Sequence, residues 1–312
     1  MTREAWVRED IALIPHAPSD RSAIVKSLGG SEYTPDGVVD LHDSFTGSNR
    51  PLRKFSRSTE FVAAGEHFFW LTAASGLSVL DAEIDLECHG AVQPDPEVMN
   101  LVVSGIEHLS TNELAFHTFR TFVSHLCLLE PTDPGVKPIT SCSIPDFPFV
   151  MFFTRIASRH IPPLTLVDVE SPVLLAENMY HESVHQFVNN MLLTRNILKP
   201  SYDSATSPRV EIYWRRNAQG VSSSWELDRC LHAATVYAQV VRWRVRELRS
   251  RRISSAERQA LEEANLQSTE ALSYLCLALQ AHLEAFTPAG CVFLGRLVEA
   301  ATERIYDARA II

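Results

Sequence analysis

The sequence lacks a continuous apolar run of about 18 residues, which excludes an ordinary membrane-spanning helix. Its six cysteines form no CxxC pair and no regular framework, so we expect reduced, mostly buried thiols of a cytosolic protein. The N-terminal sequence MTREAWVREDIALIPH carries charges throughout and has no apolar h-region, unlike a secretory signal. These absences predict a cytoplasmic protein that makes no use of a membrane.

Positive charge is also scarce. The 28 lysines and arginines are outnumbered by 38 acidic residues, which leaves a net charge of −10. Such a surface repels phosphate backbones, so we expect no nucleic-acid partner. The 46% hydrophobic content nevertheless suits a globular protein with a sizeable core, and 312 residues suffice for one large domain.

In the N-terminal part, residues 1–139, the pattern is mixed. Pro, Gly, Ser and Asp predict loops with short helices up to residue 60, and apolar residues then predict a helix over 59–80. Weak alternation over 78–89 is typical of a strand. Two helices are expected between residues 95 and 129, divided by a Ser-Thr-Asn cluster that offers an N-cap.

Residues 140–312 form the expected helical, metal-binding part. The segment 144–155 is aromatic and flanked by prolines, which indicates a buried strand, and 164–169 could pair with it. Helices are predicted over 172–194 and 224–250, from residue 254 to about 286, and after Pro288. The predicted fold is α+β and predominantly α-helical, with short extended segments before the metal site, in a single compact domain over 1–312.

The motif YHESVHQF places His181 and His185 four residues apart, with Glu182 directly after the first histidine. On a helix these histidines share one face and can aim at a common point. Glu182 is turned by roughly 100°, so it flanks a metal rather than binding it. HExxH is a known arrangement for a zinc hydrolase.

The alternative is a helix with two surface histidines. Against it stands an apolar face at core spacing, which the two histidines border. The residues of that face are Tyr180, Val184, Phe187, Val188 and Met191. We therefore expect both imidazoles to point inward or into a cleft.

A metal needs a third ligand, and the usual zinc-peptidase continuations are missing. The sequence after His185 reads QFVNNML, and the later SYDSATSPRVE is a proline-broken loop. The next histidine, His232, lies on an amphipathic helix four residues after Asp228, which could hold its ring or ligate. The alternative for His232 is a satisfied core histidine.

Three pieces in order, YHESVHQFVNNMLL, YWRRNAQG and LHAATVYAQV, resemble the HExxH motif-containing putative peptide modification proteins. The segment SCSIPDFPFVMFF before the motif fits as well. The resemblance covers roughly residues 140–243. The second arginine, Arg216, departs from it, because it is followed by NAQG where a more Arg- and Pro-rich stretch is expected.

The resemblance implies an iron(II)- and 2-oxoglutarate-dependent oxygenase that hydroxylates an unactivated β-carbon of an amino acid, free, carrier-bound or within a peptide. It implies that His181, His185 and His232 bind the iron. A planar cation should hold the distal carboxylate of 2-oxoglutarate. Arg215 is the first candidate, then Arg209 and Arg216, although these arginines could equally be solvated. Trp214 and Tyr213 could wall the pocket or simply pack, and Glu182 would orient an iron-bound water or a histidine.

Two alternatives remain at this stage. A zinc metallopeptidase would use the same histidines, with Glu182 as the general base. A non-enzymatic helical scaffold would carry the motif by accident. The basic run RWRVRELRSRR, residues 242–252, could dock an acidic peptide or an anionic carrier, but a solvated helix end is the simpler interpretation.

Overall fold

The structure is a computed structural model that describes residues 88–144, 149–216, 222–250 and 252–311, except the side chain of residue 193. Before residue 88 it describes only the backbone of six strands. These are β1 (Tyr33–Thr34), β2 (Gly37–Val38), β3 (Leu41–His42), β4 (Asn49–Arg50), β5 (Glu60–Ala64) and β6 (His67–Leu71). Other expectations for residues 1–87, including most of the 78–89 strand, lie outside the described residues.

A mixed sheet has the strand order β5-β6-β8-β10-β9, and β7 pairs with the far end of β8. Its remaining strands are β7 (His89–Ala91), β8 (His125–Pro131), β9 (Ser141–Cys142) and β10 (Val150–Phe153). Strands β6, β8 and β10 run parallel, whereas β9 is antiparallel to β10 with Ser141 opposite Phe153. Short antiparallel pairs also join β1 to β2 and β3 to β4. The sheet ends on the two-residue strand β9, close to the motif helix.

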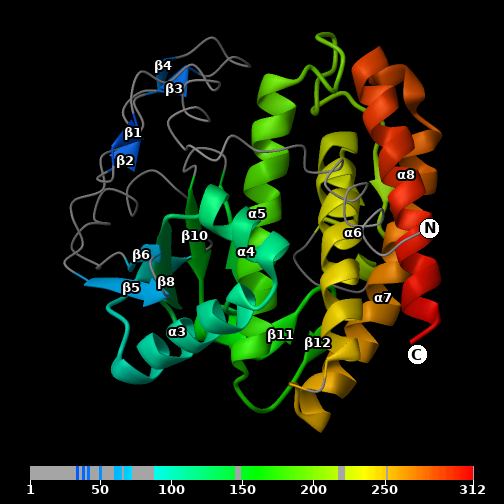
Figure 1. Cartoon of the computed structure of the whole chain (residues 1–312). Helices are drawn as coiled ribbons and strands as arrows, with labels where there is room; N and C mark the ends of the chain where they lie inside the picture. Colours follow the sequence, from blue (N-terminus) through cyan, green and yellow to red (C-terminus); the bar gives the residue numbers. More distant parts are fainter. Residues whose placement is uncertain are drawn as a thin grey trace.

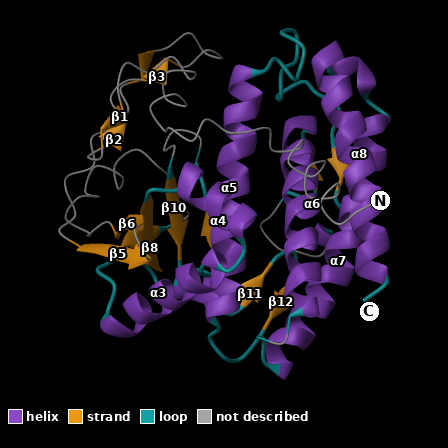
Figure 2. Ribbon diagram, in the orientation of Figure 1, coloured by secondary structure: helices purple, strands orange, loops and turns teal. Residues whose placement is uncertain are grey.

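Helices dominate the described residues, as predicted (Figure 2). They are α3 (Pro96–Ser110), α4 (Glu113–Phe122), α5 (Pro172–Thr194), α6 (Leu227–Arg249), α7 (Ser255–Gln280) and α8 (Pro288–Arg309). Helix α5, which carries the HExxH motif, lies between the sheet with α3 and α4 on one side and α6 with α7 and α8 on the other (Figure 1). None of the described helices is long and apolar enough to cross a membrane.

Helix starts follow local sequence signals. The side chain of Ser171 accepts hydrogen bonds from the backbone N–H groups of Val173 and Leu174, and Pro172 fills the first helical position of α5. Ser254 and Glu257 form the predicted capping box of α7. The predicted bounds of α5 are confirmed, and the α8 helix begins at Pro288 as expected.

Helix α5 is also tied at its C-terminal end. The chain that follows it runs beside the segment before α8, with Ile197 O accepting from Thr287 N at 3.1 Å and Ala285 O accepting from Lys199 N at 3.0 Å. A Cβ on Gly290 would lie 2.0 Å from Ile197 O, so only glycine fits there. The first turn of α8 therefore packs directly on the backbone after α5.

Four predictions about elements were wrong. The expected helix over 59–80 is, where described, the antiparallel hairpin β5–β6, whose aromatic and β-branched residues favour strands. Residues 125–129, placed in a helix, belong to β8. Residues 165–166 form β12 and pair with β11 (His160–Ile161) instead of β10. Residues 224–225 form β14, paired with β13 (Val210–Glu211), so α6 starts later than expected.

Side-chain alternation along β8 and β10 divides the core. Leu126, Leu128, Met151 and Phe153 join one cluster with the buried faces of α3 to α8. Cys127, Leu129, Val150 and Phe152 make a second cluster on the opposite face of the sheet. The sheet thus presents one face to the motif helix. Whether all 312 residues form one domain stays a prediction.

Candidate metal centre

The face of α5 toward α6 carries Glu177, His181 and His185, each four residues apart and therefore stacked along one side of the helix. Nε2 of His181 lies 3.1 Å from Nε2 of His185. From α6, His232 places its Nδ1 3.4 Å from Nδ1 of His185. The rings of His185 and His232 are stacked with centroids 5.6 Å apart. The structure therefore brings together the three histidines that the sequence singled out.

All three imidazoles are neutral bases in this setting. Burial lowers the pKa of His185 to about 3, with help from neighbouring His232 and the charge of Arg229. Burial also lowers the pKa of His232 to about 4, and that of His181 falls well below its ordinary value. Only 8% of His181 is exposed, whereas His185 and His232 are half-buried. Neutral imidazoles with free lone pairs are what a divalent transition metal requires.

The ring orientations fit a shared ion only in part. Two nitrogens bound to one ion at about 2.1 Å lie roughly 3.0–3.4 Å apart, as the Nε2 atoms of His181 and His185 do. His185, however, turns its opposite edge toward His232. Among the described residues, no group of three His, Cys, Asp or Glu side chains is therefore arranged around one point. Binding by all three histidines requires the ring of His185 or His232 to turn.

Glu182 is buried on α5 with 2% of its surface exposed. Its Oε1 accepts a hydrogen bond of 2.7 Å from the hydroxyl of Ser141 on β9, and its Oε2 has no hydrogen-bond partner among the residues that the structure describes. Burial raises the pKa of Glu182 to about 7, and the nearby hydroxyls of Ser141 and Ser143 oppose this rise. A carboxyl group with such a pKa can exchange a proton near neutral pH.

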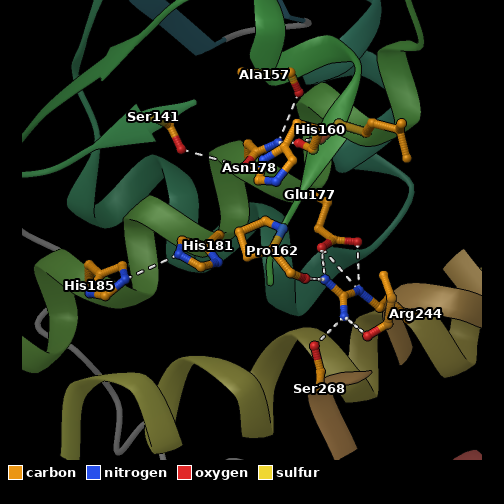
Figure 3. A network of polar contacts seen from close by, with 12 residues as sticks. Ser141, Ala157, His160, Pro162, Glu177, Asn178, His181, His185, Arg244 and Ser268 are labelled. Atoms are coloured by element: carbon orange, nitrogen blue, oxygen red, sulfur yellow. Dashed lines mark hydrogen bonds and ion pairs between the residues drawn. The ribbon is translucent and has the colours of Figure 1, made fainter. Parts of the chain in front are cut away.

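A buried arginine, Arg244, lies beside Glu177, one helical turn before His181 on α5. Arg244 of α6 donates from Nε to both carboxylate oxygens of Glu177, at 3.0 and 2.9 Å, and both side chains are fully buried. Its remaining N–H groups reach Glu177 again, Pro162 O at 2.7 Å, Ala264 O at 2.7 Å and the Ser268 hydroxyl at 2.6 Å (Figure 3). Every nitrogen of the guanidinium is used, so α5, α6, α7 and the β11–β12 turn are tied at one point.

Asn178 makes a second tie from α5 to the residues before it. Its side-chain amide donates to Ala157 O and to His160 O, both at 2.8 Å (Figure 3). The ring of His160 in turn meets the Thr140 hydroxyl at 2.7 Å. Burial lowers the pKa of His160, and the charges of Lys137 and Arg244 lower it further. These contacts fix the strand that carries Ser141 relative to the motif helix.

Two of the arginines predicted to bind a carboxylate are engaged elsewhere. Arg209 donates to the Ser224 hydroxyl at 3.0 Å and forms an ion pair with Glu226. Arg216 forms an ion pair of 2.8 Å with Glu211 at the surface. Both arginines are partly exposed, and the structure gives them carboxylate partners within the chain. They are poor candidates for a ligand site.

The other two predicted residues lie in an aromatic cluster between the 210–216 loop, α6 and α7. Trp214 makes edge contacts with Tyr213, Trp225, Tyr237 and Tyr274, at centroid distances of 4.8 to 6.5 Å. The guanidinium of Arg215 lies over the ring of Trp225, with Cζ 5.0 Å from the centroid. Packing is thus the role of Trp214 that these contacts support.

Three residues of the site escaped sequence reasoning. In the sequence, Ser141 stands out only as part of the resembling segment, Arg244 belongs to the basic run over residues 242–252, and no motif marks Arg229. The prediction of a solvated helix end is wrong for Arg244, whose side chain is 0% exposed. Asp228, expected to support His232, instead accepts a 2.8 Å hydrogen bond from Tyr202. The position of Arg244 in the sequence does not indicate its partner, because Glu177 lies 67 residues away on another helix.

No protein-family model and no curated protein sequence matches the chain.

Proposed function

We propose that this protein is an oxygenase that uses iron(II) and 2-oxoglutarate to hydroxylate an unactivated β-carbon of an amino acid, free, carrier-bound or within a peptide. One observation supports it most: His232, from a second helix, lies against the HExxH histidines. Three neutral imidazoles without a carboxylate suit a six-coordinate ion that keeps open positions. The expected cytoplasmic location remains part of the same proposal.

His181, His185 and His232 would hold the iron, which when bound supplies the activation of oxygen. The chain itself would do the rest. Burial of His181 and Glu182 excludes water from one side of the site, while half-buried His185 and His232 leave the other side open to ligands. Glu182, held by Ser141, would keep a proton-exchanging carboxyl group beside the histidines. Arg215, whose guanidinium lies over the ring of Trp225, would orient the keto acid through its distal carboxylate.

A zinc metallopeptidase is the second candidate, and Glu182 is the reason. Its pKa of about 7, and an Oε2 that has no hydrogen-bond partner in the described part of the chain, are properties of a general base that accepts a proton from a water molecule. The same two motif histidines would hold the zinc. The two candidates therefore share residues and differ in the metal and in the co-substrate.

One experiment separates them. The protein is purified without oxygen, loaded with iron or zinc, and supplied with 2-oxoglutarate and a panel of amino acids and peptides. The oxygenase predicts iron-dependent succinate formation that rises with the correct substrate and stops in His185→Ala. The peptidase predicts zinc-dependent hydrolysis that does not need 2-oxoglutarate. If neither succinate nor a hydrolysis product forms with iron or with zinc, both candidates are contradicted.

A further inference from the structure

Strand β9 is the last strand of the mixed sheet, and among the described residues no strand pairs with its outer edge. Phe152 of β10 lies opposite Cys142 of β9. Next to this pair, Thr154 donates from its backbone N–H to Thr140 O at 3.1 Å. In an antiparallel pair, residues that bond to the partner strand alternate with residues whose backbone groups point away from it. The backbone N–H and C=O of Ser141 therefore point to the outer edge of the sheet.

The outer edge of β9 has the groups that an added strand needs. Ser141, Cys142 and Ser143 are each partly exposed. Within the parts of the chain that the structure describes, neither the N–H nor the C=O of Ser141 has a backbone partner. Unpaired donors and acceptors at a sheet edge are a template for another chain. An extended peptide can satisfy them with its own main chain, whereas a free amino acid lacks the neighbouring peptide groups.

This edge lies on the side of the sheet that leads to the metal centre. The strand order runs through β8 and β10 to β9 in the direction of α5, and α6 lies beyond α5 (Figure 1). The side chain of Ser141 points toward α5 (Figure 3), where its hydroxyl donates to Glu182 Oε1 at 2.7 Å. Glu182 directly follows His181 on that helix. A strand added beyond β9 would therefore pass Glu182 and the histidines.

Pairing with β9 also decides which side chain of such a peptide enters the site. Residues directly opposite each other in neighbouring strands turn their side chains to the same face, and successive residues alternate between the two faces. Ser141 turns toward Glu182, whereas Cys142 packs on the cluster at the opposite face of the sheet. The peptide residue opposite Ser141 would thus turn its Cβ toward Glu182 and the histidines, and its two neighbours would turn away.

We infer that the outer edge of β9 binds a peptide substrate as an added strand, with the residue to be modified opposite Ser141. Among free, carrier-bound and peptide-borne amino acids, this binding mode selects the peptide. The modified position is then set by the register of the peptide on β9. The inference rests on the proposed function for the reaction at the histidines, but the pairing itself needs no metal.

The test uses the full-length, metal-free protein and a library of acetylated hexapeptide amides that are randomised at every position. Retained peptides are identified by mass spectrometry, and the tightest binder is made again with one amide N-methylated at a time. We expect the affinity to fall about tenfold or more at every second amide, because only those amides donate to β9. Hydrogen exchange at the Ser141 amide should slow on binding. The amide of Cys142, which already faces β10, is the internal control.

Two substitutions at position 141 provide matched variants. Ser141→Ala removes the hydroxyl and keeps the backbone N–H, whereas Ser141→Pro removes both. Proline is tolerated on an edge strand where the N–H points outward. We expect Ser141→Ala to bind the selected peptide almost as tightly as the unaltered protein does, and Ser141→Pro to bind it about tenfold more weakly. If Ser141→Pro does not fold, the N-methylated peptides decide the question on the unaltered protein.

Three results would overturn the inference. They are the absence of any retained peptide, equally tight binding of single acetylated amino-acid amides, and N-methylation effects without a period of two residues. Succinate formation with a free or carrier-bound amino acid would then remain a separate result. Conversely, a peptide that pairs with β9 without iron-dependent succinate formation would contradict only the proposed reaction.

Discussion

Glu177 and Arg244 form an ion pair that is fully enclosed by α5, α6 and α7, one helical turn before the first motif histidine. Breaking a buried pair by removing one partner leaves an uncompensated charge. We expect Arg244→Met to lower the free energy of unfolding by about 3–5 kcal/mol, measured by urea denaturation. The double variant Glu177→Leu, Arg244→Met should recover part of this loss, because the carboxylate that Arg244 pairs with is then removed as well. A loss below about 1 kcal/mol in the single variant would contradict this account.

His232 comes from a different helix than the motif, so its removal tests whether three histidines act together. His232→Ala should abolish activity and lower the affinity for iron or cobalt by more than about 100-fold, since loss of even an outer partner costs about 10–100-fold. Metal content after gel filtration and titration with cobalt measure this. His282→Ala, at a surface position beside Glu284, is the control. Retention of stoichiometric metal in His232→Ala would remove His232 from the ligand set.

Ser141 donates the hydrogen bond that the structure gives to the Glu182 carboxylate. Ser141→Ala should lower kcat about tenfold, which corresponds to a hydrogen bond of roughly 1.4 kcal/mol, and leave the metal content unchanged. Ser141→Thr keeps a hydroxyl at the same position and should restore most of the rate. If Ser141→Ala has the kcat of the unaltered protein, Ser141 does not position Glu182.

The buried ring of His160 makes stability depend on pH. Burial lowers its folded-state pKa below the value of about 6.5 expected in the unfolded chain. Below that pH the unfolded chain takes up a proton that folded His160 does not bind. The contribution of neutral His160 to the free energy of unfolding is therefore fully present above about pH 6.5. It is lost as the pH falls toward the folded-state pKa of His160.

Urea unfolding of the metal-free protein between about pH 7.5 and 5.5 measures this slope. In His160→Gln the free energy of unfolding should fall less steeply with acidification, by at most about 1.4 kcal/mol per pH unit. Parallel curves for the two proteins would show that His160 titrates alike in the folded and unfolded chain.

Much of the fold could be predicted from local sequence signals. Ser171 and Pro172 were enough to start α5, and the four-residue spacing of the motif histidines was enough to place both on one face. The sequence could not decide between helix and strand for short apolar runs such as residues 60–71, because these strand assignments depend on pairing with distant strands. That limit explains the missed hairpin and the late start of α6.

The site was harder to predict wherever a residue acts through a distant partner. Arg244 looked like one more charge in a basic run, since its carboxylate lies on another helix. Ser141 meets Glu182 only because β9 ends the sheet next to α5. The orientation of the His185 ring, which faces His181 with one edge and His232 with the other, depends on side-chain torsions that no spacing encodes.

Helix α5 is anchored on both sides of its histidines, by Arg244 toward its start and by the Ile197 carbonyl just past its end. A rigid-body slide of this helix would have to break one of these anchors. Rotation about the Cα–Cβ and Cβ–Cγ bonds of a histidine breaks neither. Binding of a metal ion would thus shift the NMR signals of the His185 and His232 rings, while the backbone amide signals of α5 would change little.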